Sequence, residues 1–284
     1  MLSRVKTVLN QALALVNLRI GSLTSERAAR RRLKALVRSG QFDREILPRL
    51  RQLDSVDTGW ILDAVRKYSI SLSRYCESSD ASSYSFANDY FSSPDAEVAY
   101  SLIRELRPSR IVEVGSGSSS WLMREAIADG SLRTELVCID PAPRRSVIGA
   151  ADRFLEQRVE SLEIETIPGL LTSGDFLFID SSHEVSCGSD VIYLLLSVLP
   201  RLGSGVVVHI HDVFLPYEYP REWVVDFGWG WNEQYLVQAL LEGSDSFEVL
   251  WPGHFLQRSG LVASDSFVGP KNQVASSLWL RVRS

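Results

Sequence analysis

Short apolar runs alternate with helix-like segments over the last two thirds of the chain. Helical spacing of apolar residues occurs around 119–129, 145–157 and 188–200, and the apolar runs between these segments lie at Ile111–Val114, Leu136–Ile139, Leu162–Ile167, Phe176–Ile179 and Val206–Ile210. Alternation of this kind predicts a parallel sheet with helices on both faces. Two further runs, Glu248–Trp251 and Leu278–Val282, are expected to complete the sheet. We therefore predict an α/β fold, doubly wound around a mostly parallel seven-stranded sheet.

The first 80 residues have a different pattern. Apolar residues recur at helical spacing from Val5 to Val16, within the Arg-rich stretch 27–38, and again between Leu47 and Ile70. Residues 77–93 are rich in Ser, Asp and Tyr, which is typical of a connecting segment. We predict a helical N-terminal extension over 1–80, a linker or lid over 81–93, and a ligand-binding domain over 94–284.

Charge is distributed unevenly along the chain. Residues 1–50 hold 11 Lys and Arg against 3 Asp and Glu, whereas the remainder holds 19 against 32. An acidic body argues against nucleic acid as the main substrate. The basic head leaves two interpretations open: a solvated helix face, or peripheral contact with an anionic membrane or partner. The N-terminal helices are also a natural place for contacts between subunits of a homo-oligomer.

The location of the protein is predicted from what the sequence lacks. No stretch reaches the 18 or so apolar residues of a membrane span, and no small-residue cleavage site follows the first apolar stretch. The three cysteines are odd in number, widely spaced and in no metal-binding pattern. Such cysteine usage favours a reducing compartment, so we expect a cytoplasmic protein without a transmembrane segment.

A glycine loop follows the first predicted strand. The run from Glu113 to Ser120 reads Glu-Val-Gly-Ser-Gly-Ser-Ser-Ser, and Gly115 and Gly117 allow a tight turn and a close approach of the backbone to a ligand. Ligands of doubly wound sheets bind at this end of the strands. Ser120 stands where the dinucleotide fingerprint requires glycine, which disfavours a nicotinamide cofactor.

The segment from Ile111 to Gly117 resembles the first motif of class I S-adenosylmethionine-dependent methyltransferases. Asp140, which follows the second predicted strand, is similar to the second acid of that family. The resemblance implies that the glycine loop underlies the methionine and ribose parts of S-adenosylmethionine, that Glu113 lies near the amino group, and that Asp140 accepts the ribose hydroxyls. The residues implied for the cofactor are Glu113, Gly115, Ser116, Gly117, Ser118, Asp140, Pro141 and Asp180.

Acids and histidines follow the next two predicted strands. Asp180 and His183 come after Phe176–Ile179, and His211 and Asp212 end the run that begins at Val206. Neighbouring strand ends lie about 5 Å apart in a parallel sheet, so these four side chains are expected to converge. They suit a divalent cation held by carboxylates, general-base catalysis by His183, or both together. His209 lies within the apolar run, and we expect it in the core.

Asp180-Ser-Ser-His183 followed by His211-Asp212 is similar to the bacterial metal-dependent O-methyltransferases of sugars and natural products, over about residues 89–284. The resemblance implies His183 and Asp180 as catalytic residues, and Asp180, His211 and Asp212 as ligands of Mg²⁺ or Mn²⁺. His211 departs from the family pattern, which has an acid there. The activity implied is O-methylation of a hydroxylated small molecule or saccharide.

Aromatic residues are concentrated after the fifth predicted strand, between Tyr217 and Tyr235, and are suited to stacking on a sugar or ring. Tyr84, Phe86, Tyr90 and Phe91 are candidates for the opposite wall of the same site. Two alternatives remain open from the sequence: a metal-dependent enzyme of another class on the same scaffold, and a non-enzymatic docking module that uses the basic N-terminal helices.

Overall fold

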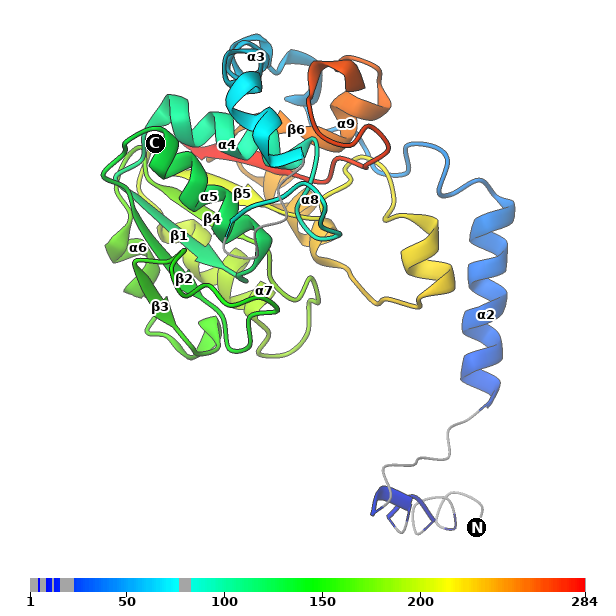
Figure 1. Ribbon diagram of the computed structural model, residues 1–284. Coiled ribbons are helices and arrows are strands. Elements are labelled where there is room, and N and C mark those ends of the chain that lie inside the picture. The colour runs from blue at the N-terminus through cyan, green and yellow to red at the C-terminus, as the bar shows by residue number, and fades with distance from the viewer. Residues whose placement is uncertain (1–4, 6–8, 12, 16–22, 77–82, 284) are drawn as a thin grey trace.

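The computed structural model describes residues 23–76 and 83–283, together with residues 5, 9–11 and 13–15 (Figure 1). Part of the predicted N-terminal helix, including Val8 and Val16, lies outside the described residues, as do residues 81 and 82 of the predicted linker. Among the helices that are described, none is long and apolar enough to cross a membrane.

A seven-stranded sheet forms the centre of the molecule, in the order β3-β2-β1-β4-β5-β7-β6. Only β7 is antiparallel to its neighbours. The predicted fold is therefore confirmed. The strands are β1 (Arg110–Val114), β2 (Glu135–Ile139), β3 (Arg153–Leu155), β4 (Phe176–Ile179), β5 (Val207–Ile210), β6 (Phe247–Pro252) and β7 (Leu278–Val282).

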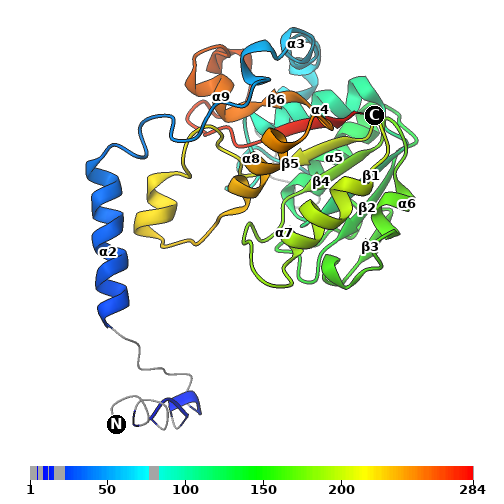
Figure 2. The ribbon, with the colours of Figure 1, turned by 180° about the vertical axis from the view of Figure 1, so that it is seen from behind.

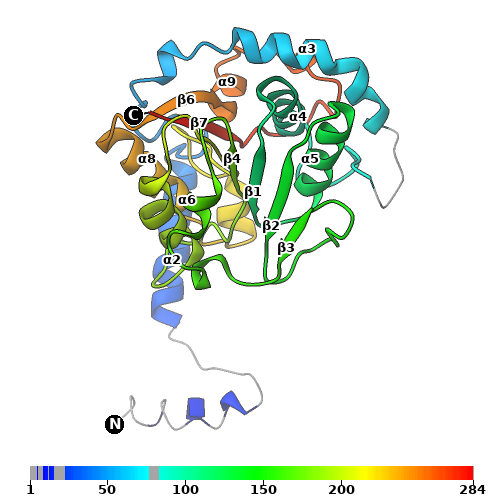
Figure 3. The same cartoon turned by 90° about the vertical axis from the view of Figure 1, so that its left-hand side faces the viewer.

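Helices cover both faces of the sheet, which explains why its central strands are apolar on both sides. Figures 2 and 3 show α4 and α5 on one face and α6, α7 and α8 on the other. The helices are α2 (Leu23–Arg38), α3 (Gly59–Ser73), α4 (Asp95–Leu106), α5 (Ser118–Asp129), α6 (Thr166–Leu170), α7 (Asp190–Ile192, continued by a π-helical stretch Tyr193–Val198 and a 3₁₀ turn Leu199–Arg201), α8 (Glu233–Gly243) and α9 (Gly253–Arg258). Single 3₁₀ turns lie at Leu53–Ser55, Arg74–Cys76, Val159–Ser161 and Ser264–Ser266, and a short π-helical turn lies at Glu222–Asp226.

Two sequence predictions between β2 and β4 are wrong. The expected helix over 145–157 instead contains strand β3, and the expected strand Leu162–Ile167 is irregular chain that leads into α6. β3 is a three-residue edge strand whose first residue, Arg153, is exposed, so it produces no apolar run. Leu162 and Ile164 alternate with polar residues because each is half buried at the surface, and this alternation resembled a strand.

The segment before α4 belongs partly to the body of the molecule. Helix α3 packs against α4, and its residues Ile61, Val65 and Leu72 are buried in the same core as the sheet. Tyr84 and Phe91 of the predicted linker are buried there too. By contrast, α2 stands away from the body in Figures 1 and 2.

Candidate active site

The glycine loop lies at the point where the strand order of the sheet reverses. The chain runs outward from β1 to β3 and then returns to β4 on the other side of β1, so a crevice opens between the ends of β1 and β4. Asp180 N, just after β4, donates to Val114 O at 2.9 Å and ties the two ends together.

Gly115 occupies this position because no other residue fits there. Its φ of +82° is left-handed, and a Cβ atom would lie 1.8 Å from the carbonyl oxygen of Asp180. Its N–H donates to Ile139 O at 3.0 Å, which also joins the loop to β2. The loop is thus clamped between two neighbouring strand ends.

Glu113 lies beneath the loop and is fully buried. Its carboxylate accepts hydrogen bonds from the hydroxyls of Ser119 and Ser120, at the start of α5, and contacts the Cys138 thiol at 3.1 Å. Burial raises the pKa of Glu113 to about 7, although the hydroxyl hydrogen bonds oppose this shift. Ser120 stands where the dinucleotide fingerprint requires glycine, and in the structure its hydroxyl is hydrogen-bonded to Glu113.

Asp140 fixes the opposite edge of the loop. Its two carboxylate oxygens accept hydrogen bonds from Ser116 N and Ala142 N, each at 2.7 Å. An ionised carboxylate offers about four lone-pair sites, so both oxygens can accept further hydrogen bonds.

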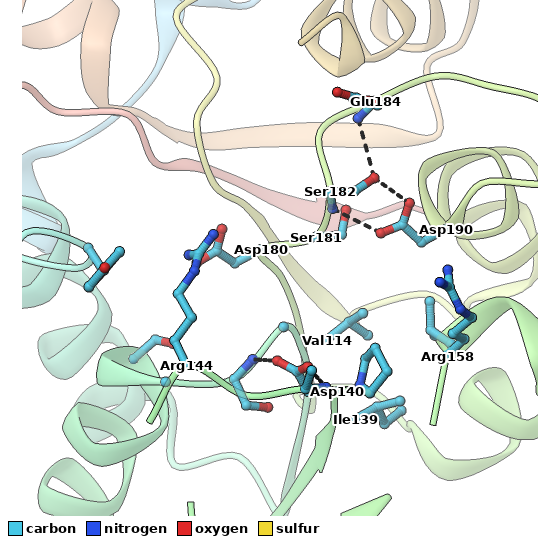
Figure 4. Close-up of a pocket in the computed structure, with 18 of the residues that line it drawn as sticks. Val114, Ile139, Asp140, Arg144, Arg158, Asp180, Ser181, Ser182, Glu184 and Asp190 are labelled. Atoms are coloured by element: carbon cyan, nitrogen blue, oxygen red, sulfur yellow. Dashed lines mark hydrogen bonds between the residues drawn. The ribbon is translucent and has the colours of Figure 1, made fainter. Parts of the chain in front are cut away.

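A cavity of about 870 Å³ opens above the loop (Figure 4). It is wide enough to hold a nucleoside-sized ligand together with a second small molecule. Of the residues predicted for the cofactor, those that line it are Gly115, Ser116, Gly117, Ser118, Asp140, Pro141 and Asp180, whereas Glu113 supports the loop from outside the cavity. Of the four aromatic residues suggested for the opposite wall, Tyr90 and Phe91 line the cavity, whereas Tyr84 and Phe86 are buried in the hydrophobic core instead.

Two buried hydroxyls in the cavity wall show that the residues fit a polar ligand. The Oγ atoms of Ser116 and Ser181 have no hydrogen-bond partner among the residues described. Orphaned buried polar atoms are costly unless a ligand or water bonds to them. Together with the Asp140 carboxylate, which lines the same cavity, they offer the hydrogen-bonding groups that the sugar and amino acid parts of S-adenosylmethionine require.

Asp180 lies at one end of this cavity and also belongs to a buried acid and imidazole cluster. His183 Nε2 lies 3.3 Å from Asp180 Oδ1 and 3.5 Å from Asp212 Oδ2. His211 Nδ1 lies 3.6 Å from an oxygen of each of the same two carboxylates. The structure thus brings together the four side chains that the sequence predicted to converge.

The backbone is strained at two residues of the cluster. His183 has φ +61° and Asp212 has φ +57°, both in the left-handed region that side chains other than glycine rarely adopt. Such conformations cost of order 1–3 kcal/mol each and are concentrated at functional sites.

Two further acids complete the cluster, and the sequence did not single them out as site residues. Glu233, the first residue of α8, contacts His183 Nδ1 through Oε2 at 2.9 Å. Asp95 is the first residue of α4, and its Oδ2 lies 3.7 Å from His211 Nε2. Its carboxylate also accepts hydrogen bonds from the backbone N–H groups of Ser276 and Ser277, just before β7. An acid at a helix start is so common that neither residue carried a distinct signal.

The electrostatics of the cluster follow from burial and mutual contact. Burial alone would lower the pKa of His183, but Asp180, Glu233 and Asp212 raise it to about 10. His211 is shifted upward in the same way by Asp212 and Asp180, against the effect of burial. In return, despite their burial, the pKa values of Asp180 and Asp212 are held below the usual range by the two imidazoles. The cluster therefore stabilises positive charge between its carboxylates.

The donor set also suits a divalent cation. One ligand atom each from Asp180, His183 and Asp212 lies within 4.8 Å of the others. Carboxylate oxygens are the ligands that Mg²⁺ prefers, and an added imidazole nitrogen suits Mn²⁺ or another transition metal. The sequence placed His211 in this set, whereas the group of three found in the structure contains His183.

An aromatic segment covers the cluster, as the concentration of aromatic residues after β5 suggested. Trp231 packs on His183 with ring centroids 4.3 Å apart, and it stacks on Trp229 at 4.5 Å. Asn232 N donates to the carbonyl of His183 at 3.0 Å, which attaches the end of this segment to the site.

His209 behaves as predicted. It is fully buried in β5, its Nε2 contacts Ser277 Oγ at 2.8 Å, and its ring stacks on Phe178 at a centroid distance of 3.8 Å. Burial lowers its pKa. It is a core residue of the sheet.

The strand order with a single antiparallel β7 and the ligand cavity at the β1–β4 switch point define a Rossmann-like methyltransferase fold. A family model described as a methyltransferase domain matches residues 112–213. This range includes the glycine loop, Asp140 and all four predicted cluster residues. The match agrees with the predicted enzyme class, a methyltransferase, over these residues.

Solved structures with a similar fold have low identity to this chain. A methyltransferase of Podospora anserina bound to S-adenosylhomocysteine is 16% identical, with a TM-score of 0.42, and the match covers 94% of this chain and 98% of that one. An O-methyltransferase of Bacillus cereus in complex with S-adenosylhomocysteine is 12% identical, with a TM-score of 0.43 and coverage of 81% and 93%. Likenesses this distant carry no argument about the reaction. No curated protein matches the chain.

Proposed function

We propose that the protein transfers a methyl group from S-adenosylmethionine to a hydroxyl of a small molecule or saccharide, with the help of a divalent cation. The observation that supports this best is the position of Asp180. This residue lines the cavity beside the glycine loop and also contacts both imidazoles of the buried cluster. A cofactor in the cavity and a reacting hydroxyl at the cluster would therefore be neighbours.

The cofactor would be held by groups that now line the cavity. Asp140 would accept the ribose hydroxyls with the lone pairs that Ser116 N and Ala142 N leave free, and the Oγ atoms of Ser116 and Ser181 would gain partners. Glu113 would position the loop through Ser119 and Ser120 and would not contact the cofactor. When bound, S-adenosylmethionine supplies a methyl group on a positively charged sulfur.

Asp180 and Asp212 would hold the cation, Mg²⁺ or Mn²⁺, and through it orient the oxygen of the acceptor. His211 would orient the two acids, because its Nδ1 lies 3.6 Å from each of them while its Nε2 contacts Ser276 Oγ at 3.2 Å. This arrangement replaces the role predicted for His211 as a direct ligand with one as a supporting residue.

His183 would accept the proton of the attacking hydroxyl at Nε2. Glu233 accepts a hydrogen bond from Nδ1–H, which fixes the tautomer with its lone pair on Nε2, toward Asp180 and Asp212. With those two acids committed to a cation, their negative charges would no longer hold a proton on the imidazole. The proton would then leave the hydroxyl as the new oxygen–carbon bond forms and the carbon–sulfur bond breaks.

The acceptor would lie under the aromatic segment. Trp231 covers His183, and stacked indoles beside carboxylates are suited to the apolar faces and hydroxyl edges of a sugar or related ring. Closure by this segment would also exclude water from the transferred methyl group.

The test is transfer of a labelled methyl group from S-adenosylmethionine to a panel of hydroxylated acceptors, with and without a chelator. We expect a labelled ether product, loss of activity with chelator, and recovery with Mg²⁺ or Mn²⁺. Asp180→Asn should lower turnover at least a hundredfold, on the scale of a lost electrostatic contact in the transition state.

Glu184→Gln is the matched control, because Glu184 lines the same cavity and its backbone N–H donates to Ser182 Oγ, while among the described residues its carboxylate forms no ion pair with the cluster. It should retain most of the activity. Full activity in the chelator would remove the cation from the proposal, and label found only in an amine or carboxylate product would overturn O-methylation.

A further inference from the structure

Helix α2 and the neighbouring segment 220–232 form a lobe beside the body, and we call these residues the basic lobe. Figures 1 and 2 show α2 standing apart from the sheet with the short helical turn Glu222–Asp226 next to it. The chain that follows α2 is attached just before the segment 220–232, since Ile46 N and Leu47 N both donate to Pro216 O at 3.1 Å. The reaction proposed above gives the lobe's outer face no role.

The charge on α2 is strongly one-sided. The helix carries six Lys and Arg and a single acid over 16 residues, and its cations are exposed. Residues 1–38 as a whole hold nine Lys and Arg against that one acid. Repulsion between so many like charges destabilises the helix on its own. The same positive field attracts an anionic partner, whose charge would relieve this repulsion.

A groove of about 550 Å³ lies between the two parts of the lobe. Its walls combine apolar and cationic side chains, and no acid lines it among the described residues: Arg30, Leu33, Lys34, Val37, Arg38, Arg221 and Val225. Arg221 is paired with Asp226 at 3.2 Å. The cationic character of the groove therefore comes mainly from α2.

Large apolar side chains are exposed on the same lobe. Phe227 is 54% exposed and Trp229 is 41% exposed. A helix face that is merely solvated needs no exposed indole or phenyl ring beside it. Cations together with exposed Trp and Phe are the composition of surfaces that lie in the interface of an anionic bilayer.

We propose that the basic lobe docks on an anionic lipid surface. The cations of α2 would face the lipid phosphates, while Phe227 and Trp229 would insert among the headgroups. The lipid surface is favoured over nucleic acid because the remainder of the chain has 32 acids against 19 cations beyond residue 50, and because a bilayer can bury apolar rings that a phosphate backbone cannot. Trp231, in the same segment, packs on His183, so docking would place the active site next to the lipid surface.

The experiment is co-sedimentation of the full-length chain, without cofactor, with vesicles of phosphatidylcholine alone or with added phosphatidylglycerol. We expect binding only to the anionic vesicles, weakened at high salt because exposed charges are screened. Replacement of Arg31, Lys34 and Arg38 by Gln should lower the partition coefficient by about a hundredfold, because each cation near a charged surface contributes roughly fivefold.

The matched control replaces Arg51, Arg133 and Arg283 by Gln, which removes three exposed cations of the body. This variant should bind like the wild type. Trp229→Ser should weaken binding at high salt as well as at low salt, whereas Ile148→Ser, at an 85% exposed residue of the body, should not.

Equal losses in the two triple variants would overturn the proposal, because net charge alone would then explain binding. Equal binding to neutral vesicles would also overturn it. The same holds if the chain binds no vesicles and instead retains a nucleic acid or forms a salt-sensitive dimer through α2. Vesicle binding is measured without methyl transfer, so its outcome is independent of the activity proposed above.

Discussion

Gly115 provides the most direct test of the geometry of the glycine loop. In Gly115→Ala the new Cβ would lie 1.8 Å from the carbonyl oxygen of Asp180, whereas real Cβ atoms keep at least 3.0 Å. The obstacle is backbone, tied to β1 by the hydrogen bond from Asp180 N to Val114 O, so no side-chain rotation relieves the clash. The ends of β1 and β4 would have to separate by roughly 1 Å.

The cost is the sum of two contributions. An alanine in the left-handed region costs about 1–2 kcal/mol, and forcing extra volume into a packed site costs about 1–3 kcal/mol. We therefore expect Gly115→Ala to lower the free energy of unfolding by about 2–5 kcal/mol, or the melting temperature by roughly 3–8 °C. Affinity for S-adenosylhomocysteine should fall as well, because the displaced Asp180 lines the cavity.

Gly117→Ala is the matched control two residues further on. A Cβ at Gly117 would meet no atom within 4 Å, so the substitution introduces no clash. Its stability in urea should lie within about 0.5 kcal/mol of the wild type. A Gly115→Ala protein as stable as Gly117→Ala would refute the close approach of β1 and β4 on which the site depends.

Three further predictions concern the site. The pKa of Glu113 is about 7 in the folded state and about 4.3 in the unfolded chain, so the free energy of unfolding should fall by about 3 kcal/mol between about pH 4.5 and pH 7. Glu113→Gln should abolish this fall in urea titrations, and an unchanged pH profile would count against the buried carboxyl. Asp212→Asn should raise the Mg²⁺ concentration for half-maximal activity by roughly 10–100-fold, while Glu184→Gln leaves it unchanged; identical metal responses would remove Asp212 from the cation site. Trp231→Ala should raise the KM for the acceptor about tenfold with little change in cofactor affinity, and a loss confined to the cofactor would show that Trp231 does not cover the acceptor.

The fold was predictable because its central strands are buried on both faces and therefore appear as continuous apolar runs. β1, β4, β5 and β7 lie within one or two residues of the ranges expected from the sequence. The prediction failed at β3, where an edge strand of three residues needs little apolar surface. The position of β3 is determined by its pairing with β2, and this pairing leaves no periodic pattern in a sequence segment of three residues.

The site was predictable to the extent that it lies at strand ends. Asp180, His183, His211 and Asp212 converge because β4 and β5 are parallel neighbours. Glu233 and Asp95 come from helices that lie 50 residues after His183 and 116 residues before His211 in the sequence, and only the packing of α8 and α4 brings them to the imidazoles. His183 Nε2 lies closer to Asp180 and Asp212 than His211 Nδ1 does, and this depends on local backbone, including the left-handed turn at His183, which residue types alone do not specify.

Calorimetric titration of S-adenosylhomocysteine into the full chain measures whether the cavity above the glycine loop binds the cofactor. We expect saturable binding of one molecule per chain. It should be weakened by Asp140→Ala through loss of the ribose contacts and unchanged in Arg133→Gln, which alters an exposed residue away from the cavity. No heat of binding at millimolar ligand, from a protein that unfolds cooperatively, would contradict this expectation.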